Sequence, residues 1–88
     1  MNYKIDDIEE MLINKLEPTR LIIDDKTHLH THHAGHEASK FHLKIDIDSP
    51  FFANKSKLEQ HKMVLDLLKP YLKEMIHSVS LETKISES

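Results

Sequence analysis

Residues 41–48 constrain the fold more than any other part of the chain, because their side chains alternate strictly between apolar and polar. The apolar positions are Phe41, Leu43, Ile45 and Ile47, and the polar positions are His42, Lys44, Asp46 and Asp48. A period of two is typical of a strand with one buried and one solvated face. We therefore predict a strand that exposes His42 and ends at Ser49-Pro50, because proline cannot donate a ladder hydrogen bond.

Helical spacing precedes this strand. Ile5, Ile8, Leu12 and Leu16 recur every three or four residues, and acidic residues lie on the opposite side. This pattern predicts an amphipathic helix whose acids complement the positive end of its dipole. Asn2 is a candidate N-cap, and Pro18 ends the helix.

A second helical region follows the strand. Its predicted apolar face is formed by Leu58, His61, Leu65, Leu68 and Leu72. Pro70 would remove a hydrogen bond and contact the Asp66 carbonyl inside a continuous helix, at a cost of about 3 kcal/mol. We therefore expect a break near Lys69, with Pro70 in the first turn of a short further helix, or else a kink.

Two more strands complete the predicted fold, one at residues 20–24 and one at residues 78–85. The order α-β-β-α-α-β predicts an α+β domain with a three-stranded mixed sheet and helices packed on one face. At 88 residues the chain is expected to form one domain over 1–88. Residues 25–38 are expected to form a histidine-rich loop, and residues 86–88 to fray.

Histidine is the unusual component of this chain. There are eight histidines, five of them between His28 and His36, and there is no cysteine. Histidine is the commonest metal ligand in proteins, so this cluster is where function is sought. The formal net charge of −3 gives no strongly basic surface for nucleic acid. No signal peptide or membrane-spanning run is visible, so we expect a cytoplasmic protein.

Five segments in order resemble the BolA-like protein family. They are THLHTHH (27–33), FHLKI (41–45), FANKS (52–56), QHKMV (60–64) and IHSVSL (76–81). Together they cover nearly the whole chain. Asn54 stands where the family usually has glycine, and asparagine tolerates a positive φ better than most residues. The segment between His36 and Phe41 is about one residue shorter than is usual in the family.

The resemblance implies a class II KH-like fold and a partnership with a monothiol glutaredoxin. In such a heterodimer a [2Fe-2S] cluster is shared with a glutaredoxin cysteine and a glutathione thiol, and the isolated chain holds no cofactor. The implied ligands here are His77 and a loop histidine, which the alignment places at His30. His28, His33 and His36 remain alternatives. Because a bound imidazole is unprotonated, cluster affinity is expected to fall toward pH values of about 6.5.

Other residues have two interpretations each. His61 is either a packed helix residue or part of a partner interface. Lys55, Lys57 and Lys62 form either a solvated face or part of the family's docking surface. A weak homodimer of the isolated chain is a further expectation.

Three functions follow from these features. The first is an iron–sulfur cluster assembly or regulatory module that works with a monothiol glutaredoxin. The second is a nucleic-acid-binding transcriptional regulator, although a single glycine cannot form the G-x-x-G loop of typical KH domains. The third is a metal chaperone that needs no partner. The sequence contains no recognisable catalytic motif, so we do not expect an enzyme.

Overall fold

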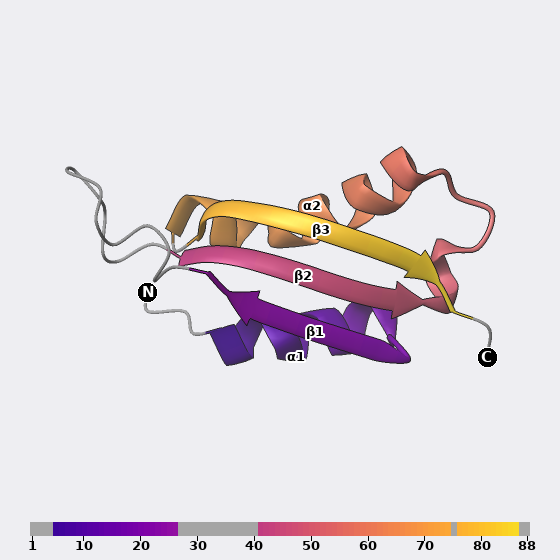
Figure 1. The fold of residues 1–88 in the computed structure, drawn as a ribbon, viewed down its shortest axis with the longest axis horizontal. Helices are drawn as coiled ribbons and strands as arrows, with labels where there is room; N and C mark the ends of the chain where they lie inside the picture. The colour runs from indigo at the N-terminus through magenta and orange to yellow at the C-terminus, as the bar shows by residue number, and fades with distance from the viewer. Residues whose placement is uncertain (1–4, 27–40, 75, 87–88) are drawn as a thin grey trace.

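The computed structural model describes residues 5–26, 41–74 and 76–86, and within them two helices pack on one face of a three-stranded sheet (Figure 1). The elements are α1 (Ile5–Leu16), β1 (Arg20–Asp25), β2 (Phe41–Ser49), the short 3-10 helix η2 (Pro50–Phe52), α2 (Lys57–Glu74) and β3 (Ile76–Ile85). The sheet order is β1-β2-β3, with β1 antiparallel and β3 parallel to β2. The predicted α+β class and mixed sheet are confirmed.

The alternation of β2 supplies the centre of the core. Leu43, Ile45 and Ile47 are at most 2% exposed and lie on the face that the helices cover. Ile8 and Leu12 of α1 and Val64 and Leu68 of α2 are fully buried in the same cluster. These four residues are all 0% exposed. One continuous core therefore joins both helices to the central strand.

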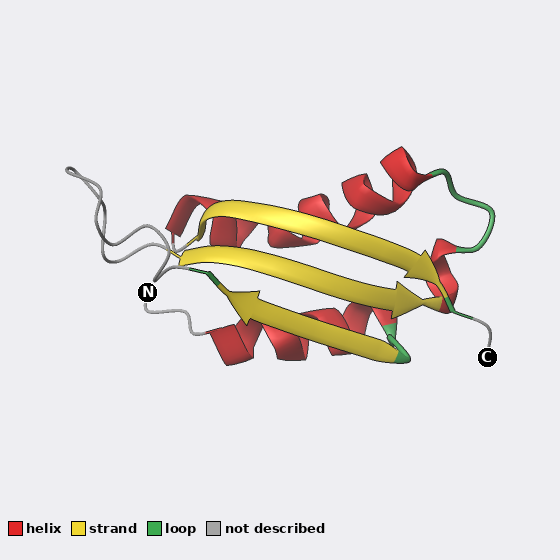
Figure 2. Cartoon of the chain, in the orientation of Figure 1, coloured by secondary structure: helices red, strands yellow, loops and turns green. Residues whose placement is uncertain are grey.

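The connection from β2 through α2 to β3 is right-handed, as predicted for parallel neighbours (Figure 1). Because β2 and β3 are parallel and β1 is antiparallel, the end of β1 lies beside the starts of β2 and β3. These three termini form the left end of the sheet in Figure 2. The opposite end carries η2 and the start of α2.

Ser49 ends β2 and joins it to two helices. Its hydroxyl donates to the Leu16 carbonyl at the end of α1 over 2.6 Å and accepts from the Phe51 backbone N–H over 3.1 Å. Pro50 then opens η2, as proline often does at the first helical position. The predicted end of the strand at Ser49-Pro50 is confirmed.

The structure corrects the prediction for α2 in two respects. The expected break near Lys69 is wrong, because α2 is one helix with Pro70 inside it. Packing accounts for this. Leu68 before the proline is fully buried, and Tyr71 and Leu72 after it pack against the core, so the helix is held to the core on both sides of Pro70. The predicted apolar face is also wrong at its first member, because Leu58 is 71% exposed.

Several predicted boundaries can be compared with the described residues. Strand β1 continues to Asp25, one residue beyond the prediction. Ser86 donates its backbone N–H to the Ser49 carbonyl over 3.2 Å and so remains paired. The Asn2 cap, residues 27–38 of the expected loop, and residues 87–88 lie outside the described residues. In the described part of the chain, no helix has the length and apolar character needed to cross a membrane.

Candidate functional site

His77 lies at an irregularity where β3 begins. The pairing of β2 with β3 joins Phe41 to Ile76 and then His42 to Ser78, so the backbone of His77 has no partner in the register. An extra residue on one strand is a β-bulge, and bulges re-aim a side chain or end the pairing of two strands. His77 therefore occupies a special backbone position at the end of the sheet.

The sequence around His77 explains the bulge. In a regular strand, residues three apart lie on opposite faces of the sheet. Val79 is aligned with Leu43 on the core side, and Ile76 is nevertheless 2% exposed and part of the core cluster. The extra residue between them allows both apolar side chains to pack on the same side. The three-residue spacing of the apolar residues Ile76 and Val79 was the sequence signal for this feature, and the predicted strand at 78–85 did not include Ile76.

His42 lies beside the bulge and is buried, contrary to the expectation that it would be exposed. Only 9% of the residue is accessible, and Nδ1 of its ring lies 2.7 Å from Ser78 Oγ. Its carbonyl accepts a 2.7 Å hydrogen bond from the Lys26 backbone N–H. The alternation had assigned His42 to the polar face correctly but could not show that a neighbouring strand supplies a hydrogen-bond partner there.

The other predicted ligands fall in the segment between β1 and β2. His28, His30, His33 and His36 lie outside the described residues. The two described residues that border this segment, Lys26 and Phe41, are both at the end of the sheet where β3 begins (Figure 2). The chain therefore leaves and re-enters the sheet at the same end as His77.

The described residues alone offer no metal site. Among residues 5–26, 41–74 and 76–86, no group of three or more histidine, cysteine, aspartate or glutamate residues is arranged to hold a metal ion. The chain also has no cysteine. The chain therefore has no thiolate of its own, and its histidine imidazoles are its candidate ligands for an iron–sulfur centre.

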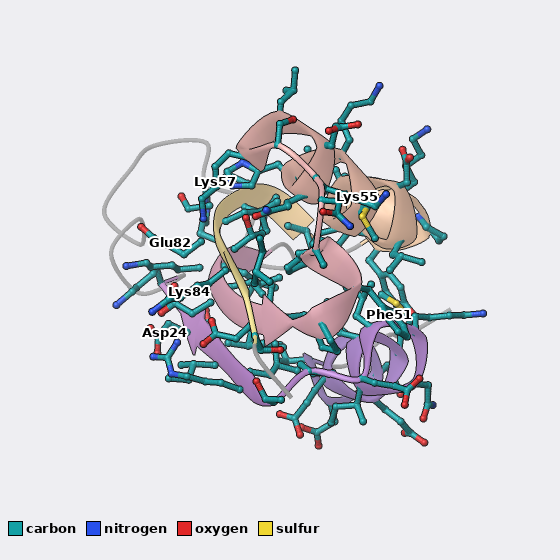
Figure 3. The ribbon with its side chains drawn as sticks, turned by 90° about the vertical axis from the view of Figure 1, so that its right-hand side faces the viewer. Asp24, Phe51, Lys55, Lys57, Glu82 and Lys84 are labelled. Carbon is teal, nitrogen blue, oxygen red and sulfur yellow. The ribbon has the colours of Figure 1, made fainter. Side chains whose placement is uncertain are left out.

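The predicted interface residues lie away from the β3 start. Lys55 comes just before α2, at the opposite end of the sheet from the start of β3 (Figure 3). Lys62 is exposed one to two turns along that helix. The ten residues of β3 separate the two ends by about 30 Å at 3.3 Å per residue. His61 is half-buried on α2. A partner that contacts both His77 and Lys55 would therefore have to extend along the domain.

Sequence reasoning missed Gln60, which lies next to His61 and points inward in its place. Gln60 is 3% exposed; it donates from Nε2 to the Lys55 carbonyl over 2.8 Å and accepts from the Thr83 hydroxyl over 2.7 Å. The side chains of adjacent helical residues point about 100° apart around the helix axis. Because Gln60 points toward the core, His61 points toward the side of the helix. Both interpretations of His61, as a packed residue and as part of a partner interface, stay predictions.

The start of α2 has a capping box that the sequence analysis did not identify. The Ser56 backbone N–H donates to Glu59 Oε1 over 2.9 Å, and the Glu59 backbone N–H donates to Ser56 Oγ over 3.2 Å. The hydrogen bond from the Ser56 backbone, followed by that from its side chain, lowers the pKa of Glu59 from 4.5. Ser-x-x-Glu before the helix was the available sequence signal.

The sheet face opposite the helices carries alternating charges. One row across the strands joins Arg20, Asp48 and Lys84, and Glu82 and Lys84 project from this face in Figure 3. A shallow cleft on the same face is lined by side chains of both signs. The lining therefore does not present a single sign of charge to a ligand.

Comparison with known proteins gives a consistent result. A family profile described as BolA-like protein matches residues 12–88. The solved structure of BolA1 from Arabidopsis thaliana has a TM-score of 0.83 at 27% identity and covers 97% of this chain and 94% of that one. The BolA domain of SufE1 from the same plant has a TM-score of 0.79 at 32% identity, with coverages of 91% and 88%.

A curated bacterial protein carries a different functional name. The DNA-binding transcriptional regulator BolA of Haemophilus influenzae is 32% identical over 74 residues, which are 84% of this chain and 69% of that protein. The chain spans only 22% of the complete SufE-like protein 1 and 50% of the complete BOLA1 of Arabidopsis. Those plant proteins therefore contain sequence beyond the part that matches this chain.

Proposed function

The chain belongs to the BolA-like protein family, and from that premise we propose that it is an iron–sulfur cluster assembly or regulatory module that pairs with a monothiol glutaredoxin. In this proposal His77 and one histidine of segment 27–40, His30 in first place, supply ligands to a shared [2Fe-2S] cluster. A glutaredoxin cysteine and a glutathione thiol complete the set. The module acts in the cytoplasm and is not an enzyme.

One structural observation carries the proposal. The unpartnered backbone position of His77 lies at the same end of the sheet as Lys26 and Phe41, the residues that border the segment with His28, His30, His33 and His36. Fourteen residues separate those borders, enough chain to reach about 20 Å outward and return, at 3.3–3.6 Å per residue. The length of this segment supports the proposal that one of its histidines contributes to a site at this end of the sheet.

The available donors fit a cluster that two proteins share. Without cysteine, this chain has no thiolate to contribute, and its proposed ligands are neutral imidazole nitrogens. Imidazole ligands on one iron of a [2Fe-2S] centre raise its reduction potential relative to four thiolates. Ligands from two proteins also separate when the proteins dissociate, which suits a cluster that is delivered or sensed. The family relatives support this direction, because they include a BolA domain within a SufE1 protein.

The decisive experiment reconstitutes the pair. Purified protein is mixed anaerobically with a monothiol glutaredoxin, ferrous iron, sulfide and glutathione, and the product is followed by size-exclusion chromatography and visible circular dichroism. We expect a heterodimer whose cluster spectrum differs from that of the glutaredoxin homodimer. A mixture that gives only the homodimer spectrum would refute the proposed function.

Single substitutions then test the ligands. His77→Ala is expected to change the heterodimer spectrum and to hasten cluster loss, whereas Ser80→Ala, at an exposed position on the same strand, is the control and should behave as wild type. His30→Ala is compared with His28→Ala, His33→Ala and His36→Ala to identify the loop ligand. An unchanged spectrum and rate in His77→Ala would remove His77 from the ligand set. Stoichiometric zinc binding by the isolated chain, sensitive to the loop variants alone, would favour the metal chaperone instead.

The name of the Haemophilus relative favours a second candidate, a DNA-binding transcriptional regulator. The charge pattern gives it less support, because the net charge is −3 and the open sheet face carries both signs. Fluorescence anisotropy with a labelled duplex tests it. Submicromolar binding that weakens steeply with salt, and weakens further in Lys55→Ala and Lys62→Ala, would establish DNA binding.

A further inference from the structure

Strand β1 is an edge of the sheet, and in the described part of the chain no further strand lies beside it (Figure 1). An edge strand presents backbone N–H and C=O groups that can pair with another chain, and natural edges are often protected by proline, lysine or a β-bulge. Strand β1 contains no proline or lysine, and its pairing with β2 runs without a register shift. This edge therefore lacks the usual protection.

The backbone groups on this edge follow from the pairing on the other side of the strand. Lys26 donates its backbone N–H to the carbonyl of His42, one position beyond the last aligned pair of β1 and β2. Directly opposed residues in an antiparallel pair are alternately bonded and unbonded. Counting back from Lys26, the backbone groups of Leu21 and Ile23 point away from β2. Within the described ranges, no hydrogen bond occupies them.

The other edge of the sheet, β3, differs from this one. Lys57, the first residue of α2, donates from Nζ to the Thr83 carbonyl. A lysine at a strand edge is one of the devices that hinder the addition of another strand. Of the two edges, β1 is therefore the one that is open to pairing.

The side chains of β1 on the open sheet face are arranged so that they complement the same strand in the opposite direction. Arg20 lines the cleft on that face, and Asp24 is labelled on the same side in Figure 3. Ile22 lies between them and is 39% exposed. An antiparallel copy centred on Ile22 therefore places each Arg20 opposite an Asp24 and the two isoleucines opposite each other. Both kinds of cross-strand pair stabilise a sheet.

We propose that β1 pairs with β1 of a second copy of this chain, antiparallel and centred on Ile22, so that the two sheets join into one. Leu21 of each copy exchanges both backbone hydrogen bonds with Ile23 of the other. The arrangement has two-fold symmetry, so it closes as a dimer. Pairing over six residues is short, which places this dimer among the weak interfaces that bury less than about 1,200 Å².

The charges select this register over its neighbours. A dimer centred on Ile23 would also pair the outward backbone groups, but it would set Arg20 opposite Lys26 and Ile22 opposite Asp24. Like charges that are directly opposed destabilise a sheet. A dimer centred on Leu21 would set Arg20 opposite Ile22. The register centred on Ile22 is therefore the one in which both opposed pairs match.

Charge reversal tests both the surface and the register. Sedimentation velocity of the isolated wild-type chain, over a concentration series up to the millimolar range, should show a monomer–dimer equilibrium. Arg20→Asp and Asp24→Arg each set like charges opposite one another, so each should weaken homodimer formation by about tenfold or more. An equimolar mixture of the two variants should dimerise again, because every opposed pair then has opposite charges.

Lys84→Asp is the matched control for Arg20→Asp. Arg20 and Lys84 are both aligned with Asp48, one on each edge of the sheet, so the two reversals disturb the same neighbour. Lys84→Asp should dimerise as wild type does. Far-ultraviolet circular dichroism establishes that each variant is folded.

A cysteine at the centre of the pairing gives a second, independent measurement, because the chain has no cysteine of its own. In the proposed dimer the two Ile22 Cα atoms are about 4.5 Å apart, as in an unbonded antiparallel pair, and this spacing allows a disulfide. Ile22→Cys should therefore form a linked dimer when oxidised glutathione accepts the electrons of the two thiols. Ser80→Cys, exposed on the same face of β3, should link far more slowly. Non-reducing electrophoresis measures both rates.

The inference concerns the isolated chain, and its tests need no glutaredoxin, so its failure and that of the proposed function are separate. A wild type that stays monomeric at every concentration would overturn it. A dimer that survives both reversals, or a mixture no stronger than its components, would show that another surface or register is used. Equal linking rates of Ile22→Cys and Ser80→Cys would also refute it, and this outcome does not depend on the folding of the charge variants.

Discussion

The Thr83 hydroxyl donates a 2.7 Å hydrogen bond to Gln60 Oε1, and each residue is only 3% exposed. The same Gln60 side chain donates to the Lys55 carbonyl. One buried amide therefore joins β3, α2 and the turn before α2. Because a buried polar group without a partner costs free energy, this connection should matter for stability.

We expect Thr83→Val to lower the free energy of unfolding by about 1–3 kcal/mol, because it keeps the shape of the side chain but leaves Gln60 Oε1 without its donor. Urea unfolding measures the change. Ser80→Val is the control on the same strand, where an exposed position should change stability by less than about 0.5 kcal/mol. Equal effects of the two substitutions would show that the buried bond contributes no net stability.

Asn54 has a φ of 64°, as its place in the turn before α2 had suggested. A residue with a β-carbon other than asparagine or aspartate pays about 1–2 kcal/mol in this region. Asn54→Ala should therefore destabilise the protein by about 1 kcal/mol in urea unfolding, whereas Asn54→Gly should be close to neutral. At the neighbouring Ala53, where φ is −58°, glycine should instead destabilise by about 0.5–1 kcal/mol. Equal responses to glycine at the two positions would contradict the backbone argument.

The sequence patterns predicted the helices and strands in which the spacing of apolar residues determines the buried face. The alternation in residues 41–48 placed Leu43, Ile45 and Ile47 in the core and ended the strand where Ser49 caps η2. The helical spacing of apolar residues did not by itself determine which face of α2 points toward the core. Leu58 satisfies that period yet is exposed, because the inward position is taken by Gln60, whose partners come from β3 and the preceding turn.

The candidate site was predictable in part. A resemblance to a family identified His77, but the bulge at this residue depends on the packing of Ile76 and Val79 against the same core. The burial of His42 depends on a partner strand 36 residues away in the sequence. Such long-range pairing cannot be derived from a local pattern. The assignment of His30 among the loop histidines stays a prediction, because those residues lie outside the described ranges.

The capping box of α2 gives a pH-dependent prediction. Hydrogen bonds from Ser56 lower the pKa of Glu59 in the folded protein below 4.5, its value without these contacts. The stability that the ionised group contributes is therefore present above pH 4.5 and is lost as the pH falls through the lowered pKa. Glu59→Gln should be less stable than wild type at pH 7, and the difference should shrink below pH 4.5.

Urea midpoints measured from pH 7 to pH 2.5 check this dependence. Glu10→Gln, at an exposed position in the middle of α1, is the comparison for a glutamate without a capping role. Ser56→Ala should cost about 1 kcal/mol at neutral pH, because it removes the N-cap of α2. A difference between Glu59→Gln and wild type that is constant with pH would contradict the role of the ionised carboxylate.

Pro70 gives the last prediction, because α2 continues through it although proline lacks the N–H that would bond to the Asp66 carbonyl. Pro70 is exposed, so Pro70→Ala removes little packing and restores this helical hydrogen bond. The cost of an interior proline is about 3 kcal/mol, and the greater freedom of the unfolded chain offsets about 1 kcal/mol of the gain. We therefore expect Pro70→Ala to raise the free energy of unfolding by about 1–2 kcal/mol in urea. Lys69→Ala is the neighbouring control and should be nearly neutral, since the 3.3 Å ion pair of Lys69 with Asp66 has both side chains more than half exposed. Equal stabilities of the two variants would indicate that α2 is broken at residue 69 in solution.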